Sequence, residues 1–320
     1  MTTNTMTVRI GSLVVPPMSV GTMYFGTTVE AAAGWACLDA AFEAGARFFD
    51  TANNYAFWAG GVGDESETVL GDWFTARGAA ARDQVVLATK IGARPAHAGA
   101  GLESMLGLSR AAIRPQLLDS LRRLRTDRVD VLYAHVDDPA VDPAETLGAL
   151  SDLVEEGLVR EIAASNLTPD RVGQVMTVDS PHRYVALQQR CTYLIPAAGA
   201  DLGPHILLDE AIEEVGAAHD LTLLGYLPLL SGAYTRADRP LPAGYDTPAT
   251  AAALATLHEI ADRHGLDAGQ AVLAWMAHRN RPVLPVVGVS RPQHVTSAWA
   301  AVHTMLSQDE LTALELARRG

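Results

Sequence analysis

The sequence predicts an α/β protein with a parallel sheet, either closed as a barrel or open and doubly wound. Eight short apolar runs, each typical of a strand, alternate with helical segments through most of the 320 residues. Four of the connections that follow a strand are long, whereas those that precede a strand are often short, as at 45–46 and 157–158. Binding and catalytic residues collect on the loops after such strands, so we expect the functional face there.

The expected elements follow in chain order. Val8–Ile10 and Leu13–Val15 flank Gly11-Ser12, which is a two-residue hairpin signal. The eight strands are expected at about Met18–Gly21, Arg47–Asp50, Val85–Lys90, Val129–Ala134, Val159–Ala164, Tyr184–Gln188, Leu221–Tyr226 and Val283–Val287. The helices are expected at about Val29–Ala44, Glu65–Arg77, Ser109–Arg123, Pro143–Glu155, from Thr168-Pro169 onward, Leu207–Ala218, Ala249–His278, Pro292–Met305 and Gln308–Ala317. The helix at Pro143 has a well-formed start, because Asp142 can cap it, Pro143 suits the first helical position and Glu145 stands where a capping box requires it.

Composition indicates one large domain, residues 1–320, in a cytoplasmic protein. With 48% hydrophobic and 19% charged residues the chain can build a large core, and no linker or repeat divides it. The net charge of −13 argues against a nucleic-acid or anionic-membrane partner. Cys37 and Cys191 form no disulfide framework, which fits a reducing compartment. Residues 1–6 do not resemble a signal peptide, and no apolar run approaches the roughly 20 residues of a membrane span.

Three of the expected strands deliver an ionisable residue at their C-terminal end. These residues are Asp50, Lys90 and His135, and Tyr55 follows Asp50 in polar, turn-forming sequence. A phenol is a weak acid at neutral pH, but a nearby ammonium favours phenolate, so we expect Lys90 to lower the pKa of Tyr55. Asp50 would pair with Lys90, which is costly to bury alone, and His135 would orient a carbonyl oxygen. The four residues predict carbonyl reduction, with hydride from a bound cofactor and a proton from Tyr55.

Each of these residues alone has an ordinary structural explanation. An aspartate at a strand end commonly caps a turn, a single lysine is commonly solvated, and an isolated histidine is more often structural than catalytic. Their joint placement on successive strand ends favours a functional site.

Several separated motifs resemble those of the aldo-keto reductases, in the right order and across nearly the whole chain. The family's Asp-Thr-Ala-x-x-Tyr matches residues 50–55, its Ser-Glu-x-x-x-Gly helix matches 66–71, and Thr89-Lys90 matches its lysine strand. Residues 120–130 and the following His135-Val-Asp-Asp match the segment that carries its histidine. The resemblance implies a (β/α)8 TIM barrel with an N-terminal β-hairpin and a C-terminal helix. It also implies a nicotinamide coenzyme, usually NADP(H), bound without a dinucleotide fingerprint, and we find no such fingerprint after a strand.

The resemblance assigns coenzyme contacts residue by residue. Ser165, Asn166 and Gln188 resemble the group that holds the nicotinamide carboxamide. Tyr226 resembles the aromatic residue that stacks on the nicotinamide ring, with a buried barrel tyrosine as the plain alternative. The loop that begins at Tyr226 resembles the one that covers the pyrophosphate. The full set is Thr22, Asp50, Ser165, Asn166, Gln188, Tyr226, Leu227, Leu229, Ser231, Gly232, Gly288, Ser290, Arg291 and His294.

The segment expected to bind the adenosine phosphate departs from the family pattern. Ser290 and Arg291 offer a hydroxyl and a cation for a ribose 2′-phosphate at a helix N-terminus, or they are simply a helix cap and a surface arginine. Many members have Glu-Asn where this chain has Ser297-Ala298, and Gln or Arg in place of His294. Adenine contacts are therefore expected to be weaker, while NADP(H) is still expected in preference to NAD(H).

The loop after Tyr55, residues 56–63, is longer than the compact turn common in the family. Phe57 and Trp58 lie close enough in sequence to Tyr55 to line a substrate pocket for a bulky, partly apolar carbonyl compound. The alternative is that the two rings only anchor a long loop.

The expected function is NADPH-dependent reduction of an aldehyde or ketone, with a ketoreductase of secondary-metabolite or sugar biosynthesis as a plausible niche. One alternative is an NADP(H)-binding regulatory subunit with little turnover, like the potassium-channel β-subunits that share the fold. Several members of that wider group form tetramers or octamers, so assembly of this chain into a homo-oligomer is a further alternative. A metal hydrolase that uses His135, Asp137 and Asp138 is disfavoured, because no second ligand cluster stands out, and no metal is expected.

Overall fold

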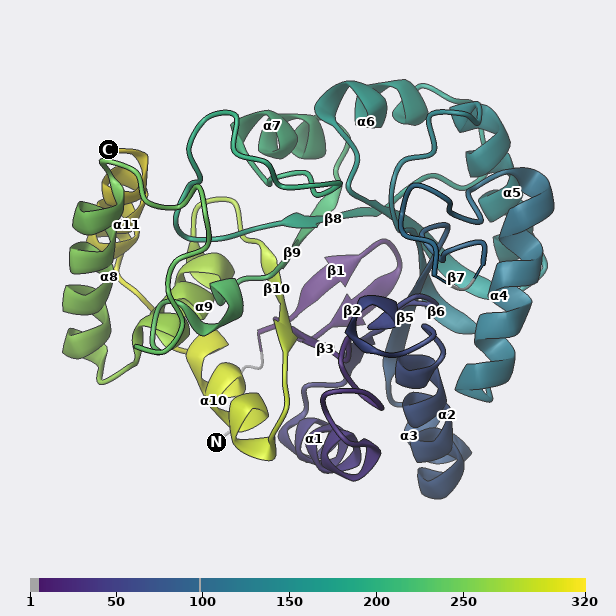
Figure 1. Ribbon diagram of the computed structural model, residues 1–320, viewed down its shortest axis with the longest axis horizontal. Helices are drawn as coiled ribbons and strands as arrows, with labels where there is room; N and C mark the ends of the chain where they lie inside the picture. The colour runs from purple at the N-terminus through teal and green to yellow at the C-terminus, as the bar shows by residue number, and fades with distance from the viewer. Residues whose placement is uncertain (1–5, 98) are drawn as a thin grey trace.

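Eight parallel strands close into a barrel in the computed structural model, which describes residues 6–97 and 99–320. Their order around the barrel is β10-β3-β4-β5-β6-β7-β8-β9 (Figure 1). The strands are β3 (Ser19–Gly21), β4 (Phe48–Asp50), β5 (Val86–Ile91), β6 (Val129–Ala134), β7 (Val159–Ser165), β8 (Ala186–Arg190), β9 (Thr222–Tyr226) and β10 (Leu284–Gly288). The barrel closes where β10 pairs with β3, with Val287 opposite Val20. The TIM barrel is therefore confirmed, and the open, doubly wound alternative is wrong.

Residues 1–5 and Ala98 lie outside the described part of the chain. The expectation that the chain carries no signal peptide rests on those first residues. It stays a prediction.

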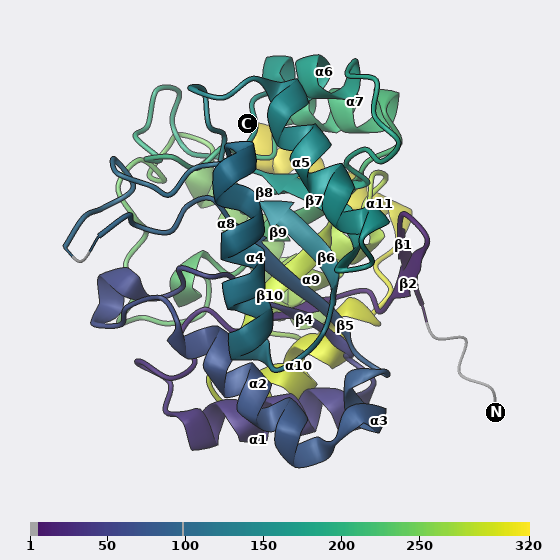
Figure 2. The ribbon, with the colours of Figure 1, turned by 90° about the vertical axis from the view of Figure 1, so that its right-hand side faces the viewer.

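The N-terminal hairpin lies at the end of the barrel opposite the long loops (Figure 2). Strand β1 (Val8–Ile10) pairs antiparallel with β2 (Leu13–Val15) across a turn in which Gly11 has a φ of 56°. Ile10, Leu13 and Val15 are at most 3% exposed. They belong to a buried cluster that also contains Phe48, Ala88, Val131, Tyr133, Ala163, Ala186, Leu224, Leu284 and Val286. The hairpin thus fills the bottom of the barrel with apolar side chains, as successive strand residues alternate in direction.

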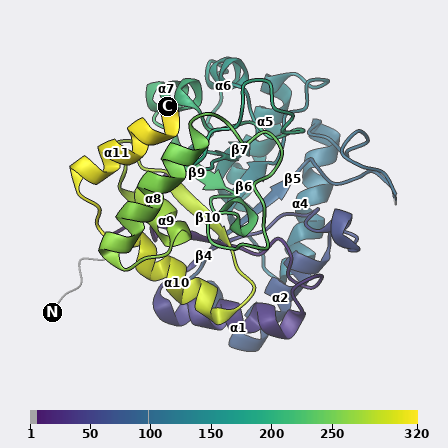
Figure 3. The same cartoon turned by 60° about the vertical axis from the view of Figure 1, so that its left-hand side comes forward.

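The helices surround the barrel and bury their apolar stripes against its outer face (Figure 1). They are α1 (Ala31–Ala44), α2 (Glu65–Arg77), α3 (Ala79–Arg82), α4 (Arg110–Leu124), α5 (Pro143–Glu155), α6 (Pro169–Met176), α7 (Glu210–Ala218), α8 (Thr250–His264), α9 (Ala268–His278), α10 (Pro292–Val302) and α11 (Gln308–Arg319). The expected C-terminal helix, α11, packs beside α8 (Figure 3). Within the described ranges, no helix has the length and apolar character needed to cross a membrane.

The segment from 249 to 278, expected to be helical throughout, is two helices. Gly265 ends α8 in the left-handed conformation, with a φ of 63°. Asp267 and Gln270 then form a capping box that starts α9. A glycine C-cap followed by an N-cap aspartate marks the end of one helix and the start of the next. The prediction of a single helix did not use this signal.

Both cysteines are free and buried, in agreement with the absence of a disulfide framework. Burial raises the pKa of Cys37 and of Cys191 to about 11. Both side chains therefore behave as small apolar groups of the core.

Candidate active site

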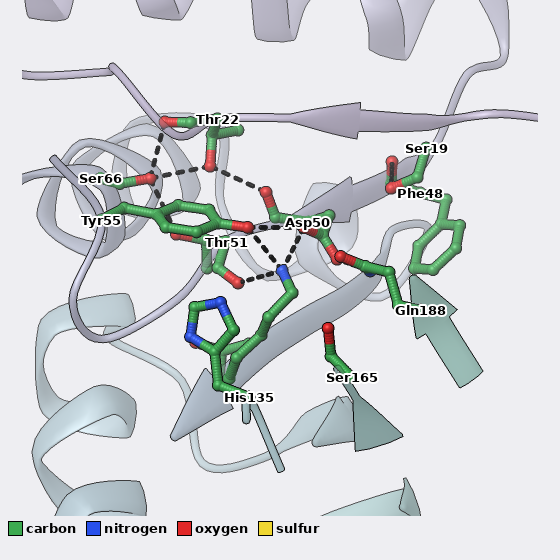
Figure 4. Close-up of polar contacts among 12 residues, drawn as sticks. Ser19, Thr22, Phe48, Asp50, Thr51, Tyr55, Ser66, His135, Ser165 and Gln188 are labelled. Atoms are coloured by element: carbon green, nitrogen blue, oxygen red, sulfur yellow. Dashed lines mark hydrogen bonds and ion pairs between the residues drawn. The ribbon is translucent and has the colours of Figure 1, made fainter. Parts of the chain in front are cut away.

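Polar and aromatic side chains meet where six neighbouring strands end. Because the strands are parallel, their C-terminal ends share one mouth of the barrel, where Figure 4 shows several of these side chains pointing toward one another. In chain order they are Asp50 at the end of β4, Lys90 in β5, His135 directly after β6, Ser165 at the end of β7, Gln188 in β8 and Tyr226 at the end of β9. The structure thus brings together residues that lie far apart in the sequence.

Lys90 and Asp50 form a fully buried ion pair that also holds Tyr55. The two side chains are at most 1% exposed, and Nζ of Lys90 donates a hydrogen bond to Oδ1 of Asp50. Nζ also lies 2.7 Å from the hydroxyl of Tyr55 and 3.0 Å from the carbonyl oxygen of Thr51. The Tyr55 hydroxyl lies 3.1 Å from Oδ1 of Asp50. A buried ion pair is tolerated only when such hydrogen bonds satisfy both charges, and here they do.

The loop that carries Tyr55 is fixed against β5. The backbone N–H groups of Thr51 and Asn53 continue the pairing beyond the end of β4, at 2.9 and 3.0 Å from carbonyl oxygens of β5. Arg94, in the loop after β5, donates to the carbonyl oxygen of Asn53 at 2.6 Å and pairs with Asp64 at 2.6 Å. The phenol of Tyr55 is therefore placed by backbone pairing and by a clamp from the neighbouring loop.

Burial dominates the ionisation of these groups. It raises the pKa of Tyr55 well above its ordinary value, and the Asp50 carboxylate raises it further. This corrects the expectation that Lys90 gives Tyr55 a lowered pKa: the low dielectric opposes the phenolate more strongly than the single ammonium favours it. Burial likewise lowers the pKa of Lys90, while Asp50 acts in the opposite direction.

His135 faces Tyr55 across the mouth of the barrel. The two rings are 5.9 Å apart between centroids and inclined by 72°. Burial lowers the pKa of His135 well below its ordinary value, and Lys90 and His205 lower it further. Its Nδ1 is buried and has no hydrogen-bond partner among the described residues. His135 is therefore a neutral imidazole with a free polar atom in the site.

The residues expected to hold a nicotinamide form one connected group. Asn166 donates from Nδ2 to the carbonyl oxygen of His135 and to Oγ of Ser165, both at 3.0 Å. The Tyr226 hydroxyl donates to Oδ1 of Asn166 at 2.7 Å. Gln188 donates to Oδ2 of Asp50 at 2.9 Å, which links this group to the ion pair. Asn166 has a φ of 55°, a conformation that asparagine tolerates better than most residues.

Thr22 lies behind Asp50. Its hydroxyl donates to the Asp50 carbonyl oxygen at 3.0 Å and contacts Oγ of Ser66 at 2.8 Å (Figure 4). Ser66 also donates to the carbonyl oxygen of Thr22 at 2.8 Å. The hydroxyl of Thr22 is thus engaged in tying β3 and α2 to the active-site strand, and its assignment as a coenzyme contact stays a prediction.

The expected pyrophosphate loop is a strained turn. Leu227, Leu230, Ser231 and Gly232 all have positive φ, between 45° and 91°, and residues 230–232 form a short 3-10 helix, η2 (Leu230–Gly232). A Cβ on Gly232 would approach Cδ of Arg236 to 3.1 Å, which together with its φ of 91° favours glycine there. Backbone strain of this kind clusters at ligand-binding loops, because it costs free energy that ordinary loops avoid.

The segment expected to bind the adenosine phosphate lies between β10 and α10. The Ser290 hydroxyl and Nδ1 of His294 are 3.3 Å apart. Arg291 is the N-cap residue of α10 and is exposed. It forms no ion pair with the carboxylates in the described part of the chain. Its guanidinium is therefore available at the start of a helix, which favours an anion.

Comparison with known proteins identifies the family. The sequence pattern of the Aldo/keto reductase family matches residues 17–318. The chain belongs to this family. The resemblance inferred from its motifs is thereby confirmed.

Relatives of this aldo/keto reductase include bacterial and fungal proteins. Protein tas of Escherichia coli K12 is 28% identical over 345 residues, which cover 95% of this chain and 94% of tas. Norsolorinic acid reductase B of Aspergillus parasiticus is 30% identical over 337 residues, covering 95% of this chain and 81% of that enzyme. A crystal structure of an aldo/keto reductase from Klebsiella pneumoniae, in complex with NADP and acetate, is similar with a TM-score of 0.73 and 26% identity. The similarity covers 98% of this chain and 95% of the Klebsiella protein.

The structure adds two residues that the sequence interpretation of this family member missed. Tyr133 is completely buried beneath the ion pair, with Nζ of Lys90 5.5 Å from its ring centroid. It lies two residues before His135, so strand periodicity could have placed both on the inner face. His205 contacts Tyr226, with Nδ1 2.9 Å from the hydroxyl. It lies in a long connection without any motif, so no sequence signal pointed to it.

Phe57 and Trp58 belong to a short 3-10 helix, η1 (Phe57–Ala59), which begins two residues after Tyr55. Their rings pack edge to face with centroids 5.0 Å apart, and Trp58 is 51% exposed. The pair therefore forms an aromatic corner on the loop. Its role in lining a substrate pocket stays a prediction.

The acidic pair after His135 has structural partners. Asp137 pairs with Arg171 at 2.8 Å, and Asp138 accepts from the backbone N–H of Leu108 at 2.8 Å. Among residues 6–97 and 99–320, no group of three or more His, Cys, Asp or Glu side chains is arranged to hold a metal ion. The contacts of Asp137 and Asp138 give a metal-hydrolase mechanism no support in this family member.

Proposed function

We propose that this protein reduces an aldehyde or ketone to an alcohol with NADP(H) as coenzyme. One observation carries the proposal: the Tyr55 hydroxyl lies 2.7 Å from the Lys90 ammonium and 3.1 Å from Asp50, opposite the neutral ring of His135. A phenol held between a cation and a carboxylate at the mouth of a barrel is a proton donor placed for a reacting oxygen.

The donor set at the strand ends fits a nicotinamide coenzyme. Ser165, Asn166 and Gln188 place hydroxyl and amide groups at the C-terminal ends of β7 and β8, and Nδ1 of His135 is buried without a partner among the described residues. The strained turn at 227–232 and the free Arg291 suit a pyrophosphate and a 2′-phosphate. The related Klebsiella protein binds NADP, which supports the same coenzyme here. When bound, the coenzyme supplies a hydride to the carbonyl carbon.

The residues of the chain handle the oxygen and the proton. His135, neutral because burial lowers its pKa, offers a hydrogen bond that orients the carbonyl oxygen. As the carbonyl π bond breaks, its electron pair moves to that oxygen, which takes the proton of Tyr55. The raised pKa of Tyr55 does not prevent this transfer, because an alkoxide is a far stronger base than a phenolate. Lys90 then stabilises the phenolate at 2.7 Å, and Asp50 balances the lysine charge.

The proposed substrate is a bulky, partly apolar carbonyl compound of secondary metabolism or a sugar. The exposed aromatic corner formed by Phe57 and Trp58 supports an apolar contact near Tyr55. The similarity to norsolorinic acid reductase B, which its name describes as a reductase of norsolorinic acid, supports a reductase role for this protein. A panel of aromatic ketones, aliphatic aldehydes and keto-sugars would rank these classes by kcat/KM.

The test is Tyr55→Phe, which removes only the proton donor. We expect kcat to fall by a factor of about 10² to 10⁴, the usual contribution of a general acid, while NADPH binding stays unchanged. Unchanged turnover would overturn the mechanism. Tight NADPH binding with negligible turnover of the whole panel by the native protein would favour a regulatory subunit instead.

A further inference from the structure

A chain of hydrogen bonds runs from the loop after β8 to the backbone of His135. His205 Nδ1 lies 2.9 Å from the Tyr226 hydroxyl, and that hydroxyl lies 2.7 Å from Oδ1 of Asn166. Asn166 Nδ2 then lies 3.0 Å from the carbonyl oxygen of His135. His205 is the outermost member of this chain and is exposed to solvent.

The direction of every hydrogen bond in the chain can be assigned. The backbone N–H of Ile206 donates to one end of the Asn166 amide, at 3.3 Å, so that end must be the oxygen. Tyr226 has a single proton, and only by donating it to this oxygen does it avoid a repulsive contact at 2.7 Å. The Tyr226 oxygen must then accept from His205, so the neutral histidine carries its proton on Nδ1.

Backbone pairing holds His205 in place to donate its hydrogen bond to Tyr226. The N–H of Arg190, the last residue of β8, donates to the carbonyl oxygen of Ile206 at 3.0 Å. The N–H of Leu208 donates to the carbonyl oxygen of Arg190 at 2.7 Å. The residue next to His205 is therefore anchored to the barrel, although His205 itself belongs to a long connection.

We propose that His205 is a positioning residue for the nicotinamide half of the coenzyme. By donating to Tyr226 it fixes the tilt of that ring and commits the Tyr226 proton to Asn166. Asn166 is thereby held with its oxygen toward Tyr226 and its amide N–H groups toward Ser165 and His135. The inference rests on the proposed function, because it assumes that Asn166 and Tyr226 meet a nicotinamide.

The test compares two ligands and three substitutions of His205. NADPH contacts the whole binding site, whereas adenosine 2′,5′-bisphosphate carries only the adenosine half. His205→Ala removes the hydrogen bond. His205→Asn restores an N–H donor near the position of Nδ1, and His205→Asp supplies only an acceptor, which would draw the Tyr226 proton away from Asn166.

We expect His205→Ala to weaken NADPH binding about tenfold, because the variant loses one hydrogen bond and the orientation of Tyr226 that it fixes. The affinity for the bisphosphate should not change. His205→Asn should bind NADPH within about threefold of the native protein, and His205→Asp should bind it at least as weakly as His205→Ala. In a Tyr226→Phe background, His205→Ala should have no further effect, because the partner hydroxyl is already gone.

The contrary results are distinct. Unchanged NADPH binding by His205→Ala, or equal weakening of both ligands, would overturn the role of His205 while leaving the proposed function intact. Failure of the native protein to bind NADPH at all would overturn the proposed function and this inference with it. Binding of the bisphosphate by each variant shows that the variant is folded.

Discussion

Nζ of Lys90 lies 2.7 Å from the hydroxyl of Tyr55, and both groups are buried at the mouth of the barrel. The contact couples the charge of Lys90 to the proton of Tyr55. Without a base to receive it, that proton stays on the phenol, since burial and Asp50 raise the Tyr55 pKa. In the proposed reaction the ammonium therefore stabilises the phenolate only while the proton is being transferred, which is when stabilisation accelerates a reaction.

Replacing Lys90 should uncouple stability from activity. Lys90→Met leaves the Asp50 carboxylate buried without its cation, which should lower the free energy of unfolding by about 3–5 kcal/mol. Adding Asp50→Asn removes the stranded charge and should recover most of that loss. Thermal unfolding of the native, single and double variants measures the effect, and kcat should stay low in both variants. A double variant as unstable as Lys90→Met would show that the pair is not the source of the loss.

Much of the fold followed from local sequence, because each strand is a short apolar run, and Asp50, Lys90 and His135 lie at or beside the ends of three of them. Barrel closure could not be derived from periodicity, since it depends on the pairing of β10 with β3, segments more than 260 residues apart. The sequence correctly predicted that Asp50, Lys90 and Tyr55 lie together, but the predicted direction of the pKa shift of Tyr55 was wrong. That pKa depends on burial by the whole barrel, which no motif records. The partnership of His205 with Tyr226 is equally tertiary.

Acid should destabilise the folded protein in part through His135. Burial, Lys90 and His205 hold its folded pKa well below the ordinary value of 6.5. Between those two pKa values the unfolded chain binds a proton that the folded protein does not, so stability falls as the pH drops below about 6.5. We expect the Tm of His135→Gln to change less than that of the native protein between about pH 7.5 and about pH 5.5. An identical pH dependence in the two proteins would show that His135 takes up its proton without unfolding.

Arg94 should matter for turnover more than for coenzyme binding. It clamps the Tyr55 loop through the Asn53 carbonyl oxygen and Asp64, both at 2.6 Å. Arg94→Met should lower kcat about tenfold, because a small displacement of Tyr55, the proposed proton donor, is enough to misalign it, while NADPH affinity stays unchanged. Arg110→Met is the matched control, since Arg110 pairs with Asp152 in a largely exposed ion pair. An equal fall in kcat for the two substitutions would contradict a specific role of Arg94 in placing Tyr55.

Arg291 should set the preference between the two coenzymes. It is exposed at the start of α10, next to Ser290, and no carboxylate in the described ranges pairs with it. A ribose 2′-phosphate would gain a charge-assisted hydrogen bond there, so Arg291→Met should raise the Kd for NADPH about tenfold and leave the Kd for NADH unchanged. Added salt should weaken NADPH binding by the native protein more than by the variant, because screening acts on the arginine–phosphate attraction.

Arg319→Met provides the control for that titration, because it removes another exposed charge, at the end of α11. It should change neither affinity. If Arg291→Met weakened NADPH and NADH to the same extent, the arginine would act on a group that both coenzymes share, such as the pyrophosphate. The choice between NADPH and NADH would then have to come from another residue of the segment, and Ser290, whose hydroxyl lies 3.3 Å from His294, is the next to substitute.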